Sequence, residues 1–243
     1  MITIPSRFQV FSRCGVSLVL GLLLYPEPCH TSDQVKEKSH SDIVMKRVVV
    51  MGDSLAAGFG IDPDQSFPRL LQKKVDSLDW PFAIINAGVS GDTSAGGLRR
   101  IRWLLKKPVD VLILELGGND GLRGLDVKMT GINLQGIIDR TREKYPKARI
   151  IIAGMRMPPN LGATYTRKFE RIFKELAHKN GARLIPFLLE GVGGKPELNL
   201  PDRIHPTAEG HRIIGETVWK YLKPVLRETM HPARSEQEKT EES

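Results

Sequence analysis

Apolar and polar positions along the middle of the chain follow two alternating patterns, one typical of buried strands and one typical of amphipathic helices. Several of the short runs are rich in β-branched residues and contain almost no polar residue. Strands covered on both faces of a parallel sheet must have this composition. The strand candidates are residues 43–51, 82–86, 109–116, 149–154 and 183–186. They predict five buried strands.

The segments between these runs carry apolar residues at helical spacing. One of them, 94–107, places Leu98, Ile101 and Leu104 on one side. The helix candidates are residues 68–78, 94–107, 134–144, 165–180 and 207–222. Strands alternating with helices in this way predict an α/β protein, a three-layer α/β/α sandwich with right-handed crossovers between parallel strands.

The two ends of the chain depart from this pattern. Arg7 and Arg13 precede an apolar stretch, 14–25, that is too short to span a membrane comfortably, which is the arrangement of a secretory signal peptide. The residues that follow lack a small-residue cleavage pattern, so an uncleaved N-terminal anchor is the alternative. We therefore expect a division into four parts: 1–30 a signal peptide or anchor, 31–42 a linker, 43–226 one folded domain, and 227–243 a charged, disordered tail.

Length and composition narrow the function classes. A chain of 243 residues suits one α/β domain with appendages and is short for two. The formal net charge of +8 could indicate a nucleic-acid partner, but Lys and Arg are spread over predicted helix faces without basic clusters or interleaved aromatic residues. We expect no nucleic-acid binding, while transient contact with an anionic membrane surface stays compatible with the charge. Cys14 and Cys29 both precede the domain, so no disulfide or cysteine nucleophile is expected within it.

Polar groups follow the ends of the first three strand candidates. Ser54 follows the first in VMGDSLAAG, Gly91 the second in NAGVSGDT, and Asn119 the third in ELGGND. Because ligands of parallel α/β sheets bind outside the carboxyl ends of the strands, we expect these three residues to converge on one edge. A hydroxyl, a small-residue backbone N–H and a carboxamide are the parts of a nucleophile and an oxyanion hole.

The motif DRIHP supplies a base and its partner. Asp202 and His205 are three residues apart, in a segment stiffened by Pro201 and Pro206. A neutral imidazole takes the proton of a serine, and a nearby carboxylate fixes its tautomer. This short spacing differs from that of the common α/β-hydrolases, in which the acid and the histidine lie far apart in the sequence. Their nucleophile also lies in the motif G-x-S-x-G.

Each of these fragments also has a purely structural interpretation. Ser54 could cap a helix, Asn119 could serve a turn, and Asp202 with His205 could form a surface turn. The ordered set of four fragments favours a serine hydrolase. Its chemistry needs no cofactor, and no histidine spacing such as H-E-x-x-H predicts a metal site.

The motifs GDSLAAG, NAGVSGDTSAGGL, ELGGNDGLRG and DRIHP resemble the four blocks of the SGNH (GDSL) hydrolases, and more narrowly the bacterial thioesterase I / lysophospholipase / arylesterase group. The resemblance covers about residues 44–226. It implies a flavodoxin-like five-stranded parallel sheet, a triad of Ser54, Asp202 and His205, and an oxyanion hole formed by Ser54 N–H, Gly91 N–H and the Asn119 side chain. Members are usually periplasmic or secreted, which suits the N-terminal pattern.

The resemblance also places MRMPPNLGATY in a region that lines the acyl pocket of that group. Apolar residues after strand ends are expected to line an acyl site here: Leu122, Leu125, Met155, Met157, Pro158, Pro159 and Leu161. The predicted activity is hydrolysis of aryl, acyl or lysophospholipid esters, or of acyl thioesters, through an acyl-enzyme in a monomer. Two alternatives are an O-deacetylase of cell-wall or other polysaccharide and a non-catalytic binding module with the same fold.

Overall fold

The computed structural model describes residues 44–231, in which five strands form one parallel sheet. The strands are β1 (Lys46–Gly52), β2 (Phe82–Gly88), β3 (Val111–Glu115), β4 (Arg149–Ala153) and β5 (Arg183–Ile185), and their order across the sheet is β2-β1-β3-β4-β5. Each of the five overlaps one predicted run, with ends that differ by up to three residues. The predicted α/β class and five-stranded parallel sheet are therefore confirmed.

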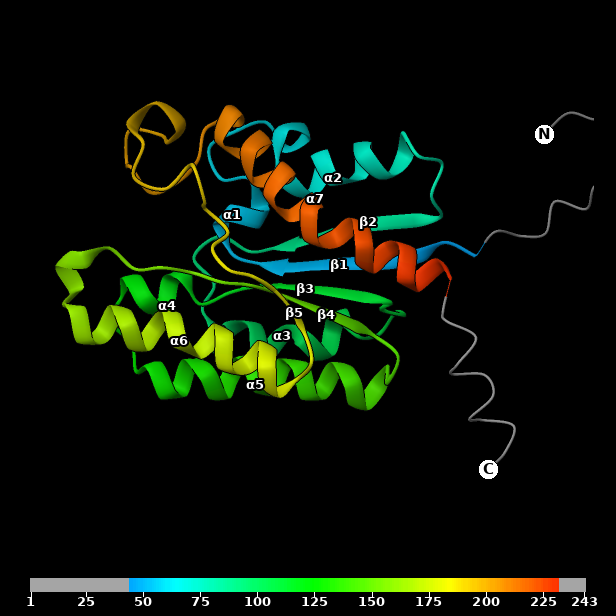
Figure 1. The fold of residues 1–243 in the computed structure, drawn as a ribbon, viewed down its shortest axis with the longest axis horizontal. Coiled ribbons are helices and arrows are strands. Elements are labelled where there is room, and N and C mark those ends of the chain that lie inside the picture. The colour runs from blue at the N-terminus through cyan, green and yellow to red at the C-terminus, as the bar shows by residue number, and fades with distance from the viewer. Residues whose placement is uncertain (1–43, 232–243) are drawn as a thin grey trace, which may run out of the picture. The chain divides into compact units, whose positions relative to one another are not determined.

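Helices cover both faces of this sheet, as the three-layer prediction required. Figure 1 shows α2 and α7 on one face and α3, α5 and α6 on the other. The α-helices are α1 (Ser54–Ala57), α2 (Phe67–Asp76), α3 (Ser94–Leu104), α4 (Gly118–Leu122), α5 (Val127–Lys144), α6 (Ala163–Lys179) and α7 (Ala208–Met230). Three short 3-10 helices are η1 (Pro63–Gln65), η2 (Pro159–Leu161) and η3 (Pro196–Leu198). The predicted helices are present, although α5 begins at Val127 instead of residue 134. Helices α1 and α4 and the 3-10 turns are too short to show a periodicity and were not predicted.

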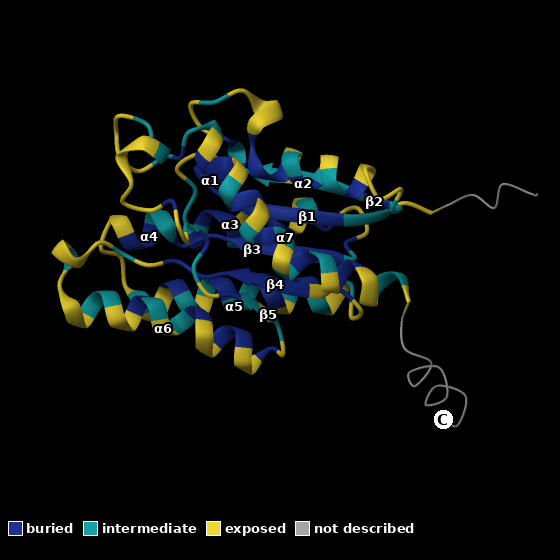
Figure 2. Cartoon of the chain, turned by 45° about the horizontal axis from the view of Figure 1, so that its top comes forward, coloured by how far each residue is buried: buried dark blue, intermediate teal, exposed yellow. Residues whose placement is uncertain are grey.

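The core lies between the sheet and its two helix layers. Every residue of β3 is buried, and β1, β3 and β4 form much of the dark interior of Figure 2. Full burial of one Val, Ile or Phe side chain contributes about 1.5–3 kcal/mol, so the apolar strands supply much of the driving force for folding. The one charged residue inside β3 is Glu115, which is also buried.

The carboxyl-terminal boundaries of the prediction need correction. Helix α7 continues through Pro224 to Met230, so it does not end at residue 222, and residues 227–230 are helix instead of tail. Proline removes one backbone donor, but Val225 and Leu226 are buried and hold the last turns against the core. The predicted signal peptide or anchor, the linker and tail residues 232–243 lie outside the described residues. Within 44–231 no helix is both long and apolar enough to cross a bilayer.

The register of three neighbouring strands, β2, β1 and β3, brings their carboxyl ends to the same level. Gly52 at the end of β1 pairs with Gly88 of β2 and with Glu115 of β3. Ser54, Gly91 and Asn119 follow these three positions within a few residues. The chain therefore delivers all three to one edge of the sheet, as the predicted topology required.

Candidate active site

Ser54 is the first residue of α1, at the turn where β1 passes into this short helix. Its neighbour Asp53 is the N-cap, because Asp53 Oδ1 accepts a hydrogen bond from Leu55 N at 3.0 Å. Ser54 therefore does not cap the helix, and the structural interpretation of this serine is wrong. The turn depends on Gly52, since a Cβ there would lie 2.1 Å from Glu115 Oε2.

The Ser54, His205 and Asp202 side chains form one hydrogen-bonded line. Ser54 Oγ lies 3.0 Å from His205 Nε2, and His205 Nδ1 lies 2.7 Å from Asp202 Oδ2. The carboxylate can only accept, so Nδ1 carries the proton and Nε2 presents its lone pair to the hydroxyl. This tautomer is the one that can take a proton from serine.

The loop that carries Asp202 and His205 is folded on itself. Asp202 Oδ1 accepts from Ile204 N at 2.9 Å and from His205 N at 3.0 Å, and Leu200 N donates to His205 O at 2.7 Å. Arg203 adopts a left-handed conformation with φ of 59°, which lets the carboxylate reach these N–H groups. The backbone N–H of His205, then its side chain, then the N–H of Ile204 lower the pKa of Asp202 to about 2. Asp202 is therefore a carboxylate at any pH near neutrality.

Phe59 packs against the imidazole of His205. The ring centroids are 4.4 Å apart and the planes are tilted by 41°. The contact restricts rotation of the imidazole and covers one of its faces. His205 consequently stays partly shielded, with 19% of its side chain exposed, although Asp202 beside it is more open.

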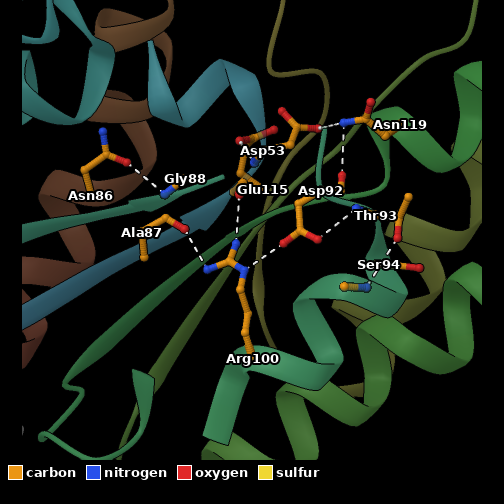
Figure 3. A network of polar contacts seen from close by, with 12 residues as sticks. Asp53, Asn86, Ala87, Gly88, Asp92, Thr93, Ser94, Arg100, Glu115 and Asn119 are labelled. Atoms are coloured by element: carbon orange, nitrogen blue, oxygen red, sulfur yellow. Dashed lines mark hydrogen bonds and ion pairs between the residues drawn. The ribbon is translucent and has the colours of Figure 1, made fainter. Parts of the chain in front are cut away.

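The predicted oxyanion donors Gly91 and Asn119 follow the carboxyl ends of β2 and β3. Gly91 has φ of 77°, a conformation that favours glycine. Asn119 Nδ2 donates to Asp53 Oδ2 at 3.2 Å and to the carbonyl oxygen of Asp92 at 3.0 Å (Figure 3). Two acceptors on one edge of the carboxamide identify that edge as the NH₂ group and fix its plane. The hydrogen bond to the Asp92 carbonyl also connects this amide to the loop of Gly91, because Asp92 directly follows Gly91.

Comparison with known proteins assigns the chain to a family. Residues 50–213 match the model of the GDSL-like Lipase/Acylhydrolase family. The chain belongs to this family. The family resemblance of the sequence motifs is thereby confirmed.

Individual relatives of this GDSL-like hydrolase carry related names. Esterase TesA of Pseudomonas aeruginosa is 39% identical over 74% of this chain and 89% of its own length. "Thioesterase 1/protease 1/lysophospholipase L1" of Escherichia coli is 36% identical over 74% of this chain and 84% of its own length. The solved structure of AlinE4, an SGNH-hydrolase family esterase, has a TM-score of 0.62 and 43% identity, and the match covers 74% of this chain and 96% of that chain.

Arg100 of α3 supports the Gly91 loop of this GDSL-like hydrolase and was missed by the sequence analysis. Its Nε donates to Asp92 Oδ2 at 2.7 Å, Nη1 to Ala87 O at 2.8 Å and Nη2 to Gly52 O at 2.9 Å (Figure 3). One guanidinium thus joins the ends of β1 and β2 to the residue after Gly91. The position of Arg100 on its helix did not indicate this role, because a basic residue exposed to solvent can occupy the same position.

Two buried acidic residues near the site were also missed. Asp120 accepts from Ser94 N at 2.8 Å and from Ser94 Oγ at 2.5 Å, which fixes α3 against the helix that carries Asn119. Glu115 lies fully buried beneath the turn of Ser54. A signal existed for Glu115, since it is the one charged side chain within the apolar part of the third strand candidate.

The predicted acyl-binding residues have mixed positions. Leu122 and Leu125 are each 42% exposed, and Pro158 and Pro159 are exposed, so all four are accessible to a ligand. Met157 is partly buried against Gly121, where a Cβ would lie 2.2 Å from its Sδ. The expectation for Met155 is wrong, because this side chain is 3% exposed and belongs to the core.

Hollows elsewhere on the surface do not coincide with this site. One of about 980 Å³ lies where the strands begin, and one of about 470 Å³ lies between α3 and α5. Neither is lined by Ser54 or His205. The lining of the acyl group therefore stays a prediction, which the chain-length series below tests.

Proposed function

We propose that this hydrolase cleaves carboxylic esters through an acyl-enzyme on Ser54. His205 acts as general base and then general acid, and Asp202 holds the imidazole in the required tautomer. The observation that carries the proposal is the line of contacts from Ser54 Oγ through His205 to Asp202, at 3.0 and 2.7 Å. The reaction uses only side chains, backbone N–H groups and water, so no metal or cofactor is required.

In the acylation step, Ser54 Oγ attacks the ester carbonyl carbon while His205 Nε2 takes the hydroxyl proton. The tetrahedral intermediate carries a negative oxygen, which receives hydrogen bonds from Ser54 N–H and Gly91 N–H. Asn119 Nδ2 is the third donor, and one of its two N–H groups leaves its acceptor on Asp53 or Asp92 to reach this oxygen. Collapse of the intermediate breaks the bond to the leaving alcohol, which takes the proton from His205. Water then attacks the acyl-enzyme by the same route and releases the acid.

The chain is an ester-hydrolysing enzyme, as its family and named relatives establish. Within this class we propose aryl, acyl and lysophospholipid esters and acyl thioesters as substrates. The relatives' names and the exposed apolar residues that follow the strand ends support this proposal. The O-deacetylase alternative predicts a preference for acetyl groups. The binding-module alternative is disfavoured because the Ser54, His205 and Asp202 side chains are hydrogen-bonded in one line.

A common acyl-enzyme can be tested by partitioning. Butyrate esters of p-nitrophenol and of phenol are hydrolysed in water containing methanol, and the ratio of methyl butyrate to butyrate is measured for each. Both esters form the same butyryl-enzyme, so the two ratios should be equal. A ratio that depends on the leaving group would show direct attack by water and contradict the mechanism.

We further propose that the enzyme is exported to the periplasm or secreted and acts as a monomer on small-molecule or lipid esters. The proposal is supported by the signal-like pattern of residues 1–30 and by the scattered basic surface. Fractionation of cells expressing the full chain checks the location. Activity confined to the cytosolic fraction would contradict export.

Asn119→Ala is expected to lower kcat by about 10²–10³-fold, the usual effect of removing one oxyanion donor. KM should change little, because the donor acts on charge that develops in the transition state. Steady-state kinetics on p-nitrophenyl butyrate give both constants. Gln135→Ala is the matched control, since this carboxamide on α5 pairs with Asn180 away from the site. Equal kcat losses in the two variants would argue against an oxyanion role for Asn119.

The accessible apolar residues predict that longer acyl chains are better substrates. Each buried methylene contributes about 0.8 kcal/mol, so each two-carbon extension should raise kcat/KM several-fold until the site is filled. We expect a rise from p-nitrophenyl acetate to butyrate and hexanoate. Leu122→Ala should flatten this rise, whereas Trp103→Ala, which removes a 68% exposed side chain on α3, should leave it unchanged. Acetate as the best substrate would instead support the deacetylase alternative.

A further inference from the structure

Glu115 is a buried carboxyl group at the end of β3 for which the proposed reaction has no direct use. Its side chain is fully buried, and Oε2 accepts from Asp53 N at 3.1 Å and from Ala56 N at 3.2 Å. These two N–H groups lie on either side of Ser54 in the chain. One oxygen of Glu115 therefore ties the turn that presents the nucleophile to the neighbouring strand.

The second oxygen of Glu115 has a different environment. Oε1 is buried, and within residues 44–231 it finds no hydrogen-bond donor. Arg100, the cation that also reaches the end of β1, is paired with Asp92 instead. A buried carboxylate with one oxygen unpaired is strongly disfavoured, whereas the protonated acid can itself donate.

Asp53 provides the acceptor for that proton. The Asp53 side chain is 2% exposed and belongs to the residue whose backbone N–H donates to Glu115 Oε2, so the two buried carboxyl groups interact. Burial, followed by the negative charge of Asp53, raises the pKa of Glu115 well above its usual range, while burial raises the pKa of Asp53 to about 6. Both carboxylate oxygens of Asp53 accept N–H groups, whereas Oε1 of Glu115 accepts none. The proton that the pair holds is therefore placed on Glu115.

We propose that Glu115 is a positioning residue of the oxyanion hole that works as a neutral carboxylic acid. It donates its proton in a hydrogen bond to the Asp53 carboxylate, whose Oδ2 accepts from Asn119 Nδ2 at 3.2 Å. The pair thus orients the carboxamide of Asn119, while Oε2 of Glu115 holds the backbone around Ser54. The inference rests on the proposed roles of Ser54 and Asn119.

The neutral state has a consequence for catalysis. Two ionised carboxylates beneath the oxyanion hole would repel the negative oxygen of the tetrahedral intermediate. With Glu115 protonated, only the carboxylate of Asp53 is negative there. Its two oxygens accept hydrogen bonds from Leu55 N and Asn119 Nδ2. An apolar site can hold a carboxylic acid neutral at pH 7 so that it serves as a hydrogen-bond donor.

Two substitutions separate the neutral acid from an ionised one. In Glu115→Gln, the carbonyl oxygen can accept the two backbone N–H groups and the NH₂ group can donate to Asp53, so kcat should stay close to that of the unsubstituted enzyme. Glu115→Ala loses all these bonds, and kcat should fall about 10- to 100-fold, less than the 10²–10³ expected for loss of the oxyanion donor itself. KM should change little in either variant.

The matched control is Thr141→Val. Thr141 is fully buried on α5, away from the site, and its Oγ1 donates to Ile137 O at 2.8 Å. This variant loses a buried hydrogen bond and is expected to keep the kcat of the unsubstituted enzyme. Melting temperatures of all variants separate a loss of stability from a loss of turnover.

The outcomes are decisive in both directions. If kcat of Glu115→Gln were as low as that of Glu115→Ala, an ionised carboxylate would be needed and the inference would be overturned. An unchanged kcat in Glu115→Ala would also overturn it. Infrared spectra at pH 7 give an independent reading: the carbonyl stretch of a protonated carboxyl group should be present in the unsubstituted enzyme and absent from Glu115→Gln. Its absence from the unsubstituted enzyme would also overturn the inference. If Ser54→Ala kept full activity, the proposed function would fail, and the infrared band would still decide the state of Glu115.

Discussion

Replacing Ser54 with alanine is expected to lower kcat by about 10⁶-fold, the effect of removing the nucleophile in a serine hydrolase. Ser54 Oγ is the atom that His205 Nε2 faces at 3.0 Å, and the variant leaves the imidazole with no hydroxyl to activate. Residual hydrolysis would come from the oxyanion donors and from binding alone. Steady-state hydrolysis of p-nitrophenyl butyrate measures the loss.

The fold should survive this substitution. Ser54 is not the N-cap of α1, and Asp53 keeps its bond to Leu55 N. Circular dichroism and the melting temperature should therefore match those of the unsubstituted enzyme. Ser77→Ala serves as the control, because this exposed hydroxyl at the end of α2 donates only to Lys74 O. A folded Ser54→Ala enzyme with most of its activity would end the proposal of a serine nucleophile.

Replacing Asp202 with asparagine is expected to lower kcat by about 10⁴-fold. The amide of asparagine donates to His205 Nδ1, so the ring proton moves to Nε2 and the lone pair no longer faces Ser54. The pKa of Asp202 is lowered to about 2, so the carboxylate that the variant replaces is fully ionised throughout the neutral range. The loss should therefore be present at every pH from about 5 to 8, well above that pKa.

Asp110→Asn is the matched control for this substitution. The Asp110 carboxylate also accepts a hydrogen bond from a backbone N–H, that of Arg47 at 2.7 Å. It lies where β3 begins, at the end of the strands opposite to Ser54. This variant is expected to keep the kcat of the unsubstituted enzyme. A small effect of Asp202→Asn, similar to that of the control, would mean that the imidazole is oriented by other contacts.

The strands and main helices could be predicted because their patterns are local and repeated. The runs that form β1, β3 and β4 are almost entirely buried, which leaves no polar face to obscure them. The run that forms β2 is mostly half-buried and was recognised from its apolar residues. Helix α7 was cut short in the prediction, since continuation beyond Pro224 depends on burial of Val225 and Leu226 against distant residues. Such tertiary contacts leave no local pattern.

The residues of the proposed triad could be predicted for two different reasons. Asp202 and His205 lie in one loop, so their hydrogen bond follows from a spacing of three residues. Ser54 reaches His205 across 151 positions, and its role emerged only from the ordered set of motifs and the parallel topology. The supporting shell of Arg100 and Glu115 was missed because a single charged residue in a strand or helix does not reveal which distant group it contacts.

The most direct test of the central claim is to locate the covalent adduct of a fluorophosphonate probe. The full chain is labelled at neutral pH, digested, and the modified residue is identified by mass spectrometry, with heat-denatured enzyme as the control. The account predicts one phosphonylated position, Ser54, and labelling only in the folded enzyme. A stoichiometric adduct on any other residue, with Ser54 unmodified while activity is lost, would contradict it.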